Sequence, residues 1–267
     1  MKKKIGKIIM PYTVTQRIKA IQQPAGGYIP VSAMSIKQYR DNFSLNSKEN
    51  ISANYVELAV DYLTRFRVTG NVEDAFDIPI LGAKILFHNY GMHKEYLHCL
   101  KLLESVKAGD ISLAVQLTAY DVVYRAGITD IQRLSPDAPT IENIEIMVNR
   151  GVSFLKHSSS EIKTGLTFEG GYTDVVVNGD CDYVTDNSLI DFKVLRRNVT
   201  KNHTLQILMY YLMGLHSIHS SEFQKVQWLA IFNPRKNIVY YIGVRRIPEA
   251  VIDEVSREVI GYADRGN

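Results

Sequence analysis

The spacing of apolar residues changes near residue 160, and this change limits the folds open to the chain more than any other feature. Before it, apolar residues recur at the three- and four-residue intervals of amphipathic helices, as over 54–66. After it, β-branched and aromatic residues form short alternating runs, as over 172–177. We therefore expect a mostly helical N-terminal region, 1–160, and a region richer in strands, 161–267.

The individual elements follow from these periods and from capping and turn residues. Asn178-Gly179 between two apolar runs is typical of a tight hairpin turn. In the first region we expect helices over 54–66, 74–89 (broken at Pro79), 96–106, 111–125 and 140–156, and a short one capped by Ser35. In the second region we expect strands over 172–177, 180–184 and 189–195, a helix over 202–216, a hairpin of 226–232 with 238–244, and a helix from Pro248.

This order of elements predicts an α/β (α+β) protein with a mixed central sheet flanked by helices, and a helical N-terminal part packed on or beside it. The hydrophobic fraction of 46% is enough for a sizeable core, and no apolar run is long enough to cross a bilayer. Cys99 and Cys181 are too few for a disulfide framework, so we expect reduced thiols and a cytoplasmic location. The lysine-rich N-terminus is interpreted as a basic arm or a first strand.

Carboxylates and a lysine are expected to gather on one face of the hairpin that follows Gly179. Side chains alternate between the two faces of a strand. If residues 185–188 form the loop, Val184 pairs with Leu189. The same register places Asp182 opposite Asp191, and Asp180 opposite Lys193.

Two carboxylates facing each other across a β-ladder repel, which destabilises the pair unless the face is solvated or a cation lies between them. The apolar neighbours of Asp191 favour a buried hairpin. A hard divalent cation, Mg²⁺ or Mn²⁺, relieves the repulsion with oxygen ligands. Lys193 beside it would hold a water molecule or a phosphate. The alternative is a charged face that is simply wet.

The helix expected after this hairpin carries further polar residues on one side. Gln206 and Tyr210 are separated by four positions and so share a helix face, and His203 precedes Gln206 on the same side. A separate apolar stripe, which would seat the helix on the sheet, consists of Leu205, Leu208, Leu212 and Leu215.

Together these residues resemble the PD-(D/E)xK nuclease superfamily, and within it the RecB-like exonuclease branch. The resemblance covers about residues 165–215 and depends on three motifs in order: Gly-X-X-Asp ending at Asp182, Asp191-Phe192-Lys193, and Gln206-X-X-X-Tyr210. It implies a restriction-endonuclease-like core in 161–267 and a Mg²⁺-dependent enzyme that hydrolyses phosphodiester bonds in DNA.

The resemblance also implies roles for these residues. Asp182, Asp191 and the backbone carbonyl of Phe192 would bind the metal ion. Lys193 would orient the attacking water and stabilise charge in the transition state. Gln206 and Tyr210 would complete the catalytic site by fixing its geometry or by contacting the DNA backbone.

Cations that follow the Asp-X-Lys motif are candidates for contacts with DNA phosphates. They are Arg196, Arg197 and Lys201, joined by His203. Lys236, Arg245 and Arg246 would extend the same track. The net charge of +3 permits a nucleic-acid partner without indicating one.

Three features depart from the family pattern. The further acidic or histidine metal ligand of many relatives has no clear counterpart; the candidates are Glu57, His88, Glu145 and Glu169. Two cysteines exclude the iron–sulfur subtype. No helicase motif is present, so unwinding would need a helicase or another DNA-processing partner. Two alternatives remain open at this stage: an inactive nucleic-acid-binding protein with a nuclease-like fold, and a structural or partner-binding protein.

Overall fold

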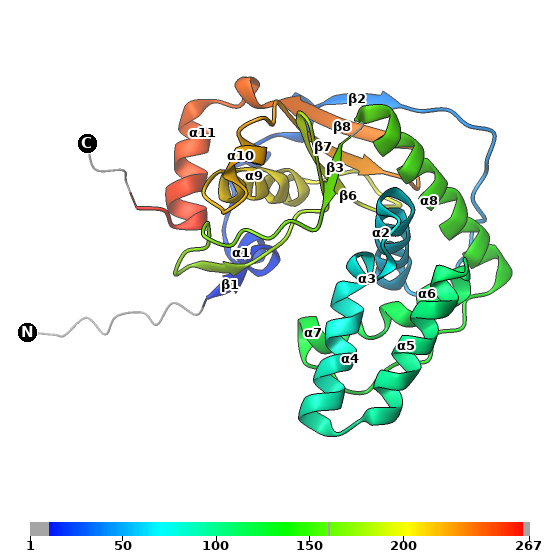
Figure 1. Ribbon diagram of the computed structural model, residues 1–267. Coiled ribbons are helices and arrows are strands. Elements are labelled where there is room, and N and C mark those ends of the chain that lie inside the picture. Colours follow the sequence, from blue (N-terminus) through cyan, green and yellow to red (C-terminus); the bar gives the residue numbers. More distant parts are fainter. Residues whose placement is uncertain (1–10, 160, 264–267) are drawn as a thin grey trace, which may run out of the picture. The chain divides into compact units, whose positions relative to one another are not determined.

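The computed structural model describes residues 11–159 and 161–263. These residues form a mixed α/β structure with a six-stranded mixed sheet and flanking helices (Figure 1). The expected fold class is therefore confirmed at this level. The N-terminal lysine-rich segment, interpreted above as an arm or strand, lies outside the described residues.

Two compact units divide the chain. The first comprises the chain up to Gln38, Ser159–Phe232 and Ile238 onward, and the second comprises Tyr39–Ser158 and Asn233–Asn237. One boundary falls next to the division expected at residue 160. Residues 11–38 are grouped with the C-terminal half in the first unit.

The six-stranded sheet belongs to the first unit and has the strand order β2-β8-β7-β6-β5-β3. Neighbours pair antiparallel at β2–β8, β5–β6 and β3–β5, whereas β6 and β7 run parallel. The strands are β2 Ser35–Gln38, β3 Ile162–Thr164, β5 Tyr183–Thr185, β6 Ser188–Phe192, β7 Trp228–Asn233 and β8 Ile238–Gly243. The expected hairpin of 226–232 with 238–244 thus appears as β7 and β8.

The hairpin predicted at Asn178-Gly179 is wrong. β4 (Val176–Asn178) pairs in parallel with β1 (Tyr12–Thr13) in a separate two-stranded sheet. Gly179 is needed for close packing, since a Cβ on it would lie 2.8 Å from the Cγ2 of Val14. On the edge away from β6, β5 pairs antiparallel with β3, a strand that was not expected.

Three helix predictions also need correction. Ser35 begins β2 and caps no helix, because residues 35–38 pair with the edge of β8. The helix expected over 111–125 is two helices, with a turn at Ala119-Tyr120. The break expected at Pro79 falls at Phe76 instead, and Pro79 lies in the first turn of the next helix, where its missing N–H costs nothing.

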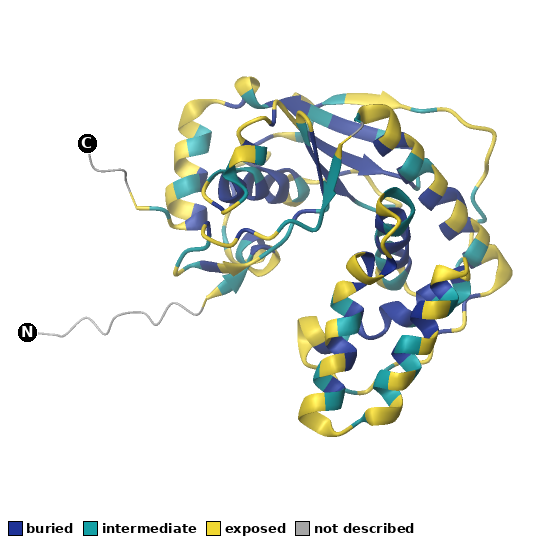
Figure 2. Cartoon of the chain, viewed as in Figure 1, coloured by how far each residue is buried: buried dark blue, intermediate teal, exposed yellow. Residues whose placement is uncertain are grey.

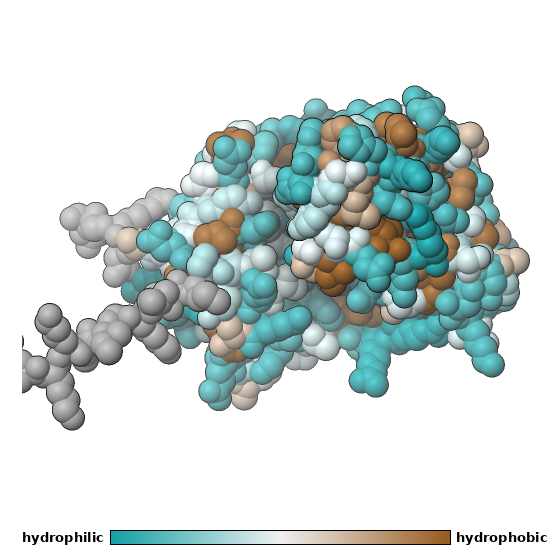
Figure 3. Space-filling model, turned by 90° about the horizontal axis from the view of Figure 1, so that it is seen from below, coloured by the Kyte–Doolittle hydropathy of each residue, from teal (hydrophilic) through white to brown (hydrophobic). Residues whose placement is uncertain are grey.

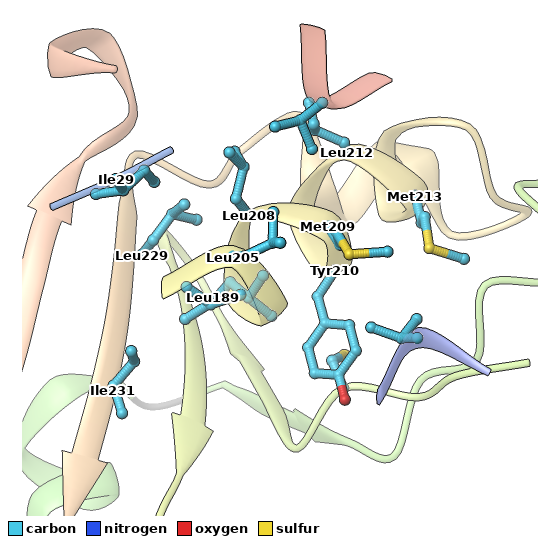
Figure 4. Packing of buried hydrophobic residues seen from close by; sticks show 14 of the residues in the cluster. Ile29, Leu189, Leu205, Leu208, Met209, Tyr210, Leu212, Met213, Leu229 and Ile231 are labelled. Atoms are coloured by element: carbon cyan, nitrogen blue, oxygen red, sulfur yellow. The ribbon is translucent and has the colours of Figure 1, made fainter. Parts of the chain in front are cut away.

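Helix α9 (Lys201–Leu215) forms the centre of the first unit's core, as the sequence predicted for residues 202–216. It lies against the sheet face that carries Leu189, Leu229 and Ile231 (Figure 4). Most of the helix is buried, on its polar positions as well as its leucine stripe (Figure 2). The remaining helices of this unit are α1 Val14–Ala20, η1 Val31–Ala33, α10 Ser220–Phe223, η2 Val244–Arg246, α11 Glu249–Glu254 and the π-helical η3 Val255–Ile260.

The second unit is helical and has its own buried carboxylate, Asp121, to which the Tyr62 hydroxyl donates and with which the exposed Arg125 pairs at 3.1 Å. Its helices are α2 Ala53–Thr69, α3 Val72–Ala75, α4 Asp77–Tyr90, α5 His93–Lys107, α6 Ile111–Thr118, α7 Asp121–Ala126 and α8 Ala138–Ser158. Among the described residues, no helix has the length and apolar character needed to cross a membrane. On the surface seen in Figure 3, hydrophobic areas are interrupted by hydrophilic residues.

Candidate active site

The β5–β6 hairpin has the predicted register. Val184 pairs with Leu189 and Tyr183 with Ile190. The turn is shorter than expected, since both Thr185 and Ser188 belong to the strands. The Ser188 N–H donates to the Thr185 hydroxyl at 3.1 Å, which closes the turn.

Asp182 directly precedes β5, and both its main chain and its side chain are held in place. Its carbonyl accepts the Gly165 N–H at 3.1 Å. Its carboxylate accepts the Phe192 N–H at 2.7 Å, across the hairpin. This bond brings the Asp182 carboxylate to the end of β6, beside Asp191.

Asp191 and Lys193 form a buried ion pair. The Lys193 ammonium lies 2.8 Å and 2.9 Å from the two carboxylate oxygens of Asp191, whose side chain is only 2% exposed. The same ammonium donates to the Phe192 carbonyl at 3.2 Å. The positive charge of Lys193 therefore lies beside the Asp191 carboxylate and the Phe192 carbonyl, two of the groups predicted to bind a metal ion.

Strand alternation separates this polar cluster from an aromatic one. The Phe192 ring lies 4.6 Å from that of Tyr183 and 5.2 Å from that of Phe232, centroid to centroid. Asp191 is on the other face with Leu189, and Leu189 packs in the core around α9. The Asp191 carboxylate consequently faces the helix that carries Gln206 and Tyr210.

Gln206 and Tyr210 meet on the buried side of α9. The Gln206 side-chain amide donates to the Tyr210 hydroxyl at 2.6 Å, and both residues are buried. Burial raises the pKa of the Tyr210 phenol well above its usual range, and the carboxylates of Asp191, Asp180 and Asp182 raise it further. The phenol therefore stays protonated and can donate to an oxygen.

His203 lies one turn earlier on the same helix face. Its Nδ1 accepts the Thr200 N–H at 3.0 Å, so the neutral ring carries its proton on Nε2. Burial, and then the nearby Lys193 ammonium, lower the pKa of the imidazole to about 4. Near neutral pH, His203 is therefore an uncharged hydrogen-bond donor next to Lys193.

The predicted DNA-contacting residues lie in the loop after β6 and in the first turn of α9. Arg196, Arg197 and Lys201 are exposed. The start of α9 is packed closely against the N-terminal segment, because a Cβ on Gly27 would lie 2.6 Å from the Cβ of Lys201. Of the more distant cations, Lys236 lies in the second unit, and Arg245 and Arg246 follow β8.

The candidates for an additional metal ligand are divided between the two units. Glu169 is exposed, and its carbonyl accepts the Ile218 N–H beyond the end of α9. Glu57, His88 and Glu145 belong to the second unit, on α2, α4 and α8. Over residues 11–159 and 161–263, no three His, Cys, Asp or Glu side chains are grouped so that they could hold a metal ion.

Two residues that support the site were missed in the sequence. Thr200 is the N-cap residue of α9 and its N–H holds the His203 ring; threonine is a preferred N-cap residue, which is the signal that could have indicated it. Phe168 packs its ring 5.3 Å from that of Tyr210; no local pattern in the sequence indicates this contact.

No protein-family model, curated protein or solved structure matches this chain.

Proposed function

We propose that this protein is a divalent-metal-dependent nuclease that hydrolyses phosphodiester bonds in DNA, with a PD-(D/E)xK-type site on a restriction-endonuclease-like core. The observation that carries the proposal is the Lys193 ammonium, bound to the Asp191 carboxylate and the Phe192 carbonyl beside Asp182. Oxygen ligands and a lysine at the end of one strand are the groups that this hydrolysis needs.

The donor set fits Mg²⁺ or Mn²⁺. Both ions prefer carboxylate and carbonyl oxygens, and Mg²⁺ in enzymes is commonly held by one or two carboxylates, water and substrate phosphate. Asp182, Asp191 and the Phe192 carbonyl would supply the protein ligands. When bound, the ion would polarise the scissile phosphate and lower the pKa of a coordinated water.

The chain's own residues then have separate tasks. Lys193, displaced from Asp191, donates to the attacking water or to a phosphate oxygen and stabilises developing negative charge. Gln206 orients the Tyr210 hydroxyl, which stays protonated beside the carboxylates. His203 donates from Nε2 to a phosphate oxygen. The exposed Arg196, Arg197 and Lys201 bind flanking phosphates.

The direct test incubates the purified protein with linear and circular, single- and double-stranded DNA in Mg²⁺, Mn²⁺ or EDTA. We expect cleavage with either metal and none in EDTA. Asp191→Asn and Lys193→Ala should each lower the cleavage rate by at least about 100-fold, because each removes a group that acts in the transition state.

Lys225→Ala is the matched control. Lys225 is an exposed lysine of the same unit, paired with Glu222 at 3.3 Å, and its loss should leave cleavage unchanged. Circular dichroism must show that each variant is folded at the assay temperature. Wild-type rates in the Asp191 or Lys193 variant, or no cleavage by the wild type on any of the substrates, would refute the proposal.

A further inference from the structure

Trp228, the only tryptophan in the chain, lies on the surface at the start of β7 and is 40% exposed. The Tyr241 ring meets it edge-on, with 5.7 Å between centroids and 66° between planes. An indole exposed to this extent beside a second aromatic ring presents a flat apolar surface to the solvent.

This surface is separate from the candidate active site. In the parallel β6–β7 pair, Trp228 is the partner of Ser188, whereas Asp191 is the partner of Ile231. Three residues along a strand correspond to about 10 Å, and an odd offset places the side chains on opposite faces. Trp228 is therefore on the other face of the sheet from Asp191.

Gly243 is buried and lies close to one edge of the indole. It follows Tyr241 by two positions on β8, so both lie on the same sheet face. A Cβ on Gly243 would lie 3.5 Å from Cζ3 of Trp228 and 3.9 Å from the Cγ of Arg246. The Arg246 stem and the indole edge therefore both lie within 4 Å of this one point.

Two cations follow Gly243 closely in the chain. Arg245 and Arg246 end η2 and are both exposed. Within residues 11–159 and 161–263, no hydrogen bond or ion pair joins either guanidinium group to another residue. We call Trp228, Tyr241, Gly243, Arg245 and Arg246 the Trp228 patch. Its uncompensated charge is complementary to an anion.

We propose that the Trp228 patch binds a single-stranded segment of nucleic acid, with a base stacked on Trp228 and the adjoining phosphates on Arg245 and Arg246. Aromatic side chains beside cations form the usual platform for unpaired strands, because every base has a π-face and every linkage a negative charge. In a duplex the bases are stacked inward, so a duplex lacks the face that the indole needs. The patch holds a strand away from the cleavage site.

The fluorescence of Trp228 can be used to measure this binding. The full-length protein is titrated with oligo(dT) in EDTA and low salt, so that no cleavage occurs, while Trp228 fluorescence is recorded. We expect saturable quenching that is reversed by salt. A blunt duplex of the same length should quench little. Because this assay needs no metal and no turnover, it can fail or succeed independently of nuclease activity.

Variants separate the contributions. Arg246→Ala should weaken the binding measured by quenching about tenfold, whereas Lys19→Ala, which removes the same charge from α1, should not. Trp228→Ala should weaken binding of a labelled oligonucleotide, measured by anisotropy, and Trp228→Phe should retain most of it. Unfolding curves check that each variant is folded.

Three results would overturn the inference. One is binding of the labelled oligonucleotide without any change in Trp228 emission, which would place the strand elsewhere. Another is equal quenching in the wild type and Arg246→Ala. The third is emission that depends on protein concentration and not on oligonucleotide, with a dimer seen by light scattering; the patch would then contact a second copy of the chain.

Discussion

The Lys193 ammonium contacts the Asp191 carboxylate and the Phe192 carbonyl, which we expect to bind a metal ion. A bound metal ion would therefore have to displace the ammonium from these oxygens. The Asp191 side chain is 2% exposed and that of Lys193 is 15% exposed. Removing one member of a buried ion pair leaves the other charge poorly compensated, at a cost of about 3–5 kcal/mol. Lys193 is therefore expected to stabilise the metal-free protein as well as to act in catalysis.

This double role leads to a prediction for Lys193→Ala. In EDTA the variant should unfold at lower temperature than the wild type, because Asp191 has lost its ammonium neighbour. Mg²⁺ should restore much of the loss, since an ion bound to the native state stabilises it by mass action. Thermal unfolding of both proteins with and without Mg²⁺ checks this. The absence of any Mg²⁺ effect on either protein would argue against a metal site at Asp191.

His203 predicts a pH dependence of stability. Its pKa is about 4 in the folded protein and its ordinary value is 6.5. Between these values the unfolded chain binds a proton that the folded chain does not, so folded stability falls as the pH is lowered from about 6.5 to about 4. His203→Gln keeps an acceptor for the Thr200 N–H but does not titrate.

Urea unfolding of the wild type and His203→Gln over a pH series isolates this group. The free energy of unfolding of the wild type, minus that of the variant, should be constant above about pH 7 and should decrease toward pH 4. A difference that stays constant, or that grows on acidification, would show that the imidazole is protonated at least as easily in the folded protein as in the unfolded chain.

At the scale of elements, the position of α9 depends on close contact with α10. Gly214 on α9 has no side chain, and a Cβ there would lie 2.2 Å from the fully buried ring of Phe223. Gly214→Ala should therefore destabilise the protein by about 1–3 kcal/mol, although alanine is the better helix former. Chemical denaturation measures the loss.

Phe223→Leu provides the matched partner for that experiment. It makes room beside α9, so the double variant should lose less than the sum of the two single losses. Strict additivity would mean that the methyl group of the alanine and the phenylalanine ring do not compete for the same space.

The same scale shows what the sequence could predict. Helix α9 and the β5–β6 register were predicted because their signals are local, and these two elements bring Asp191, Lys193, Gln206 and Tyr210 together. The pairing of β1 with β4 could not be predicted, since Tyr12 and Val176 are distant in the chain and each strand alone is too short for a pattern. Asn178-Gly179 has the composition of a turn, but in the structure Gly179 makes room for Val14 and does not form a hairpin turn.

At the scale of the whole molecule, the chain passes between the two units at residues 38/39, 158/159, 232/233 and 237/238. Neither unit is continuous in sequence. The shortest segment, Asn233–Asn237, connects two strands of the sheet but is assigned to the second unit. Arg150 of α8 donates to the carbonyl groups of Pro234 and Arg235 at 3.2 Å and 3.1 Å, which helps to hold this segment there.

Arg235 of the same segment forms a buried ion pair with Glu49, and its loss should be costly. Its guanidinium binds the two Glu49 oxygens at 2.8 Å and 3.0 Å, and the two side chains are only 7% and 4% exposed. Arg235→Met should lower the free energy of unfolding by about 3 kcal/mol, because a buried carboxylate loses its charged partner. Lys48→Met removes the same charge from an exposed position of this unit and should change stability by less than about 0.5 kcal/mol. If urea unfolding shows equal losses for the two variants, the Glu49–Arg235 pair does not stabilise the second unit. Residues 233–237 would then not be held in that unit by this ion pair.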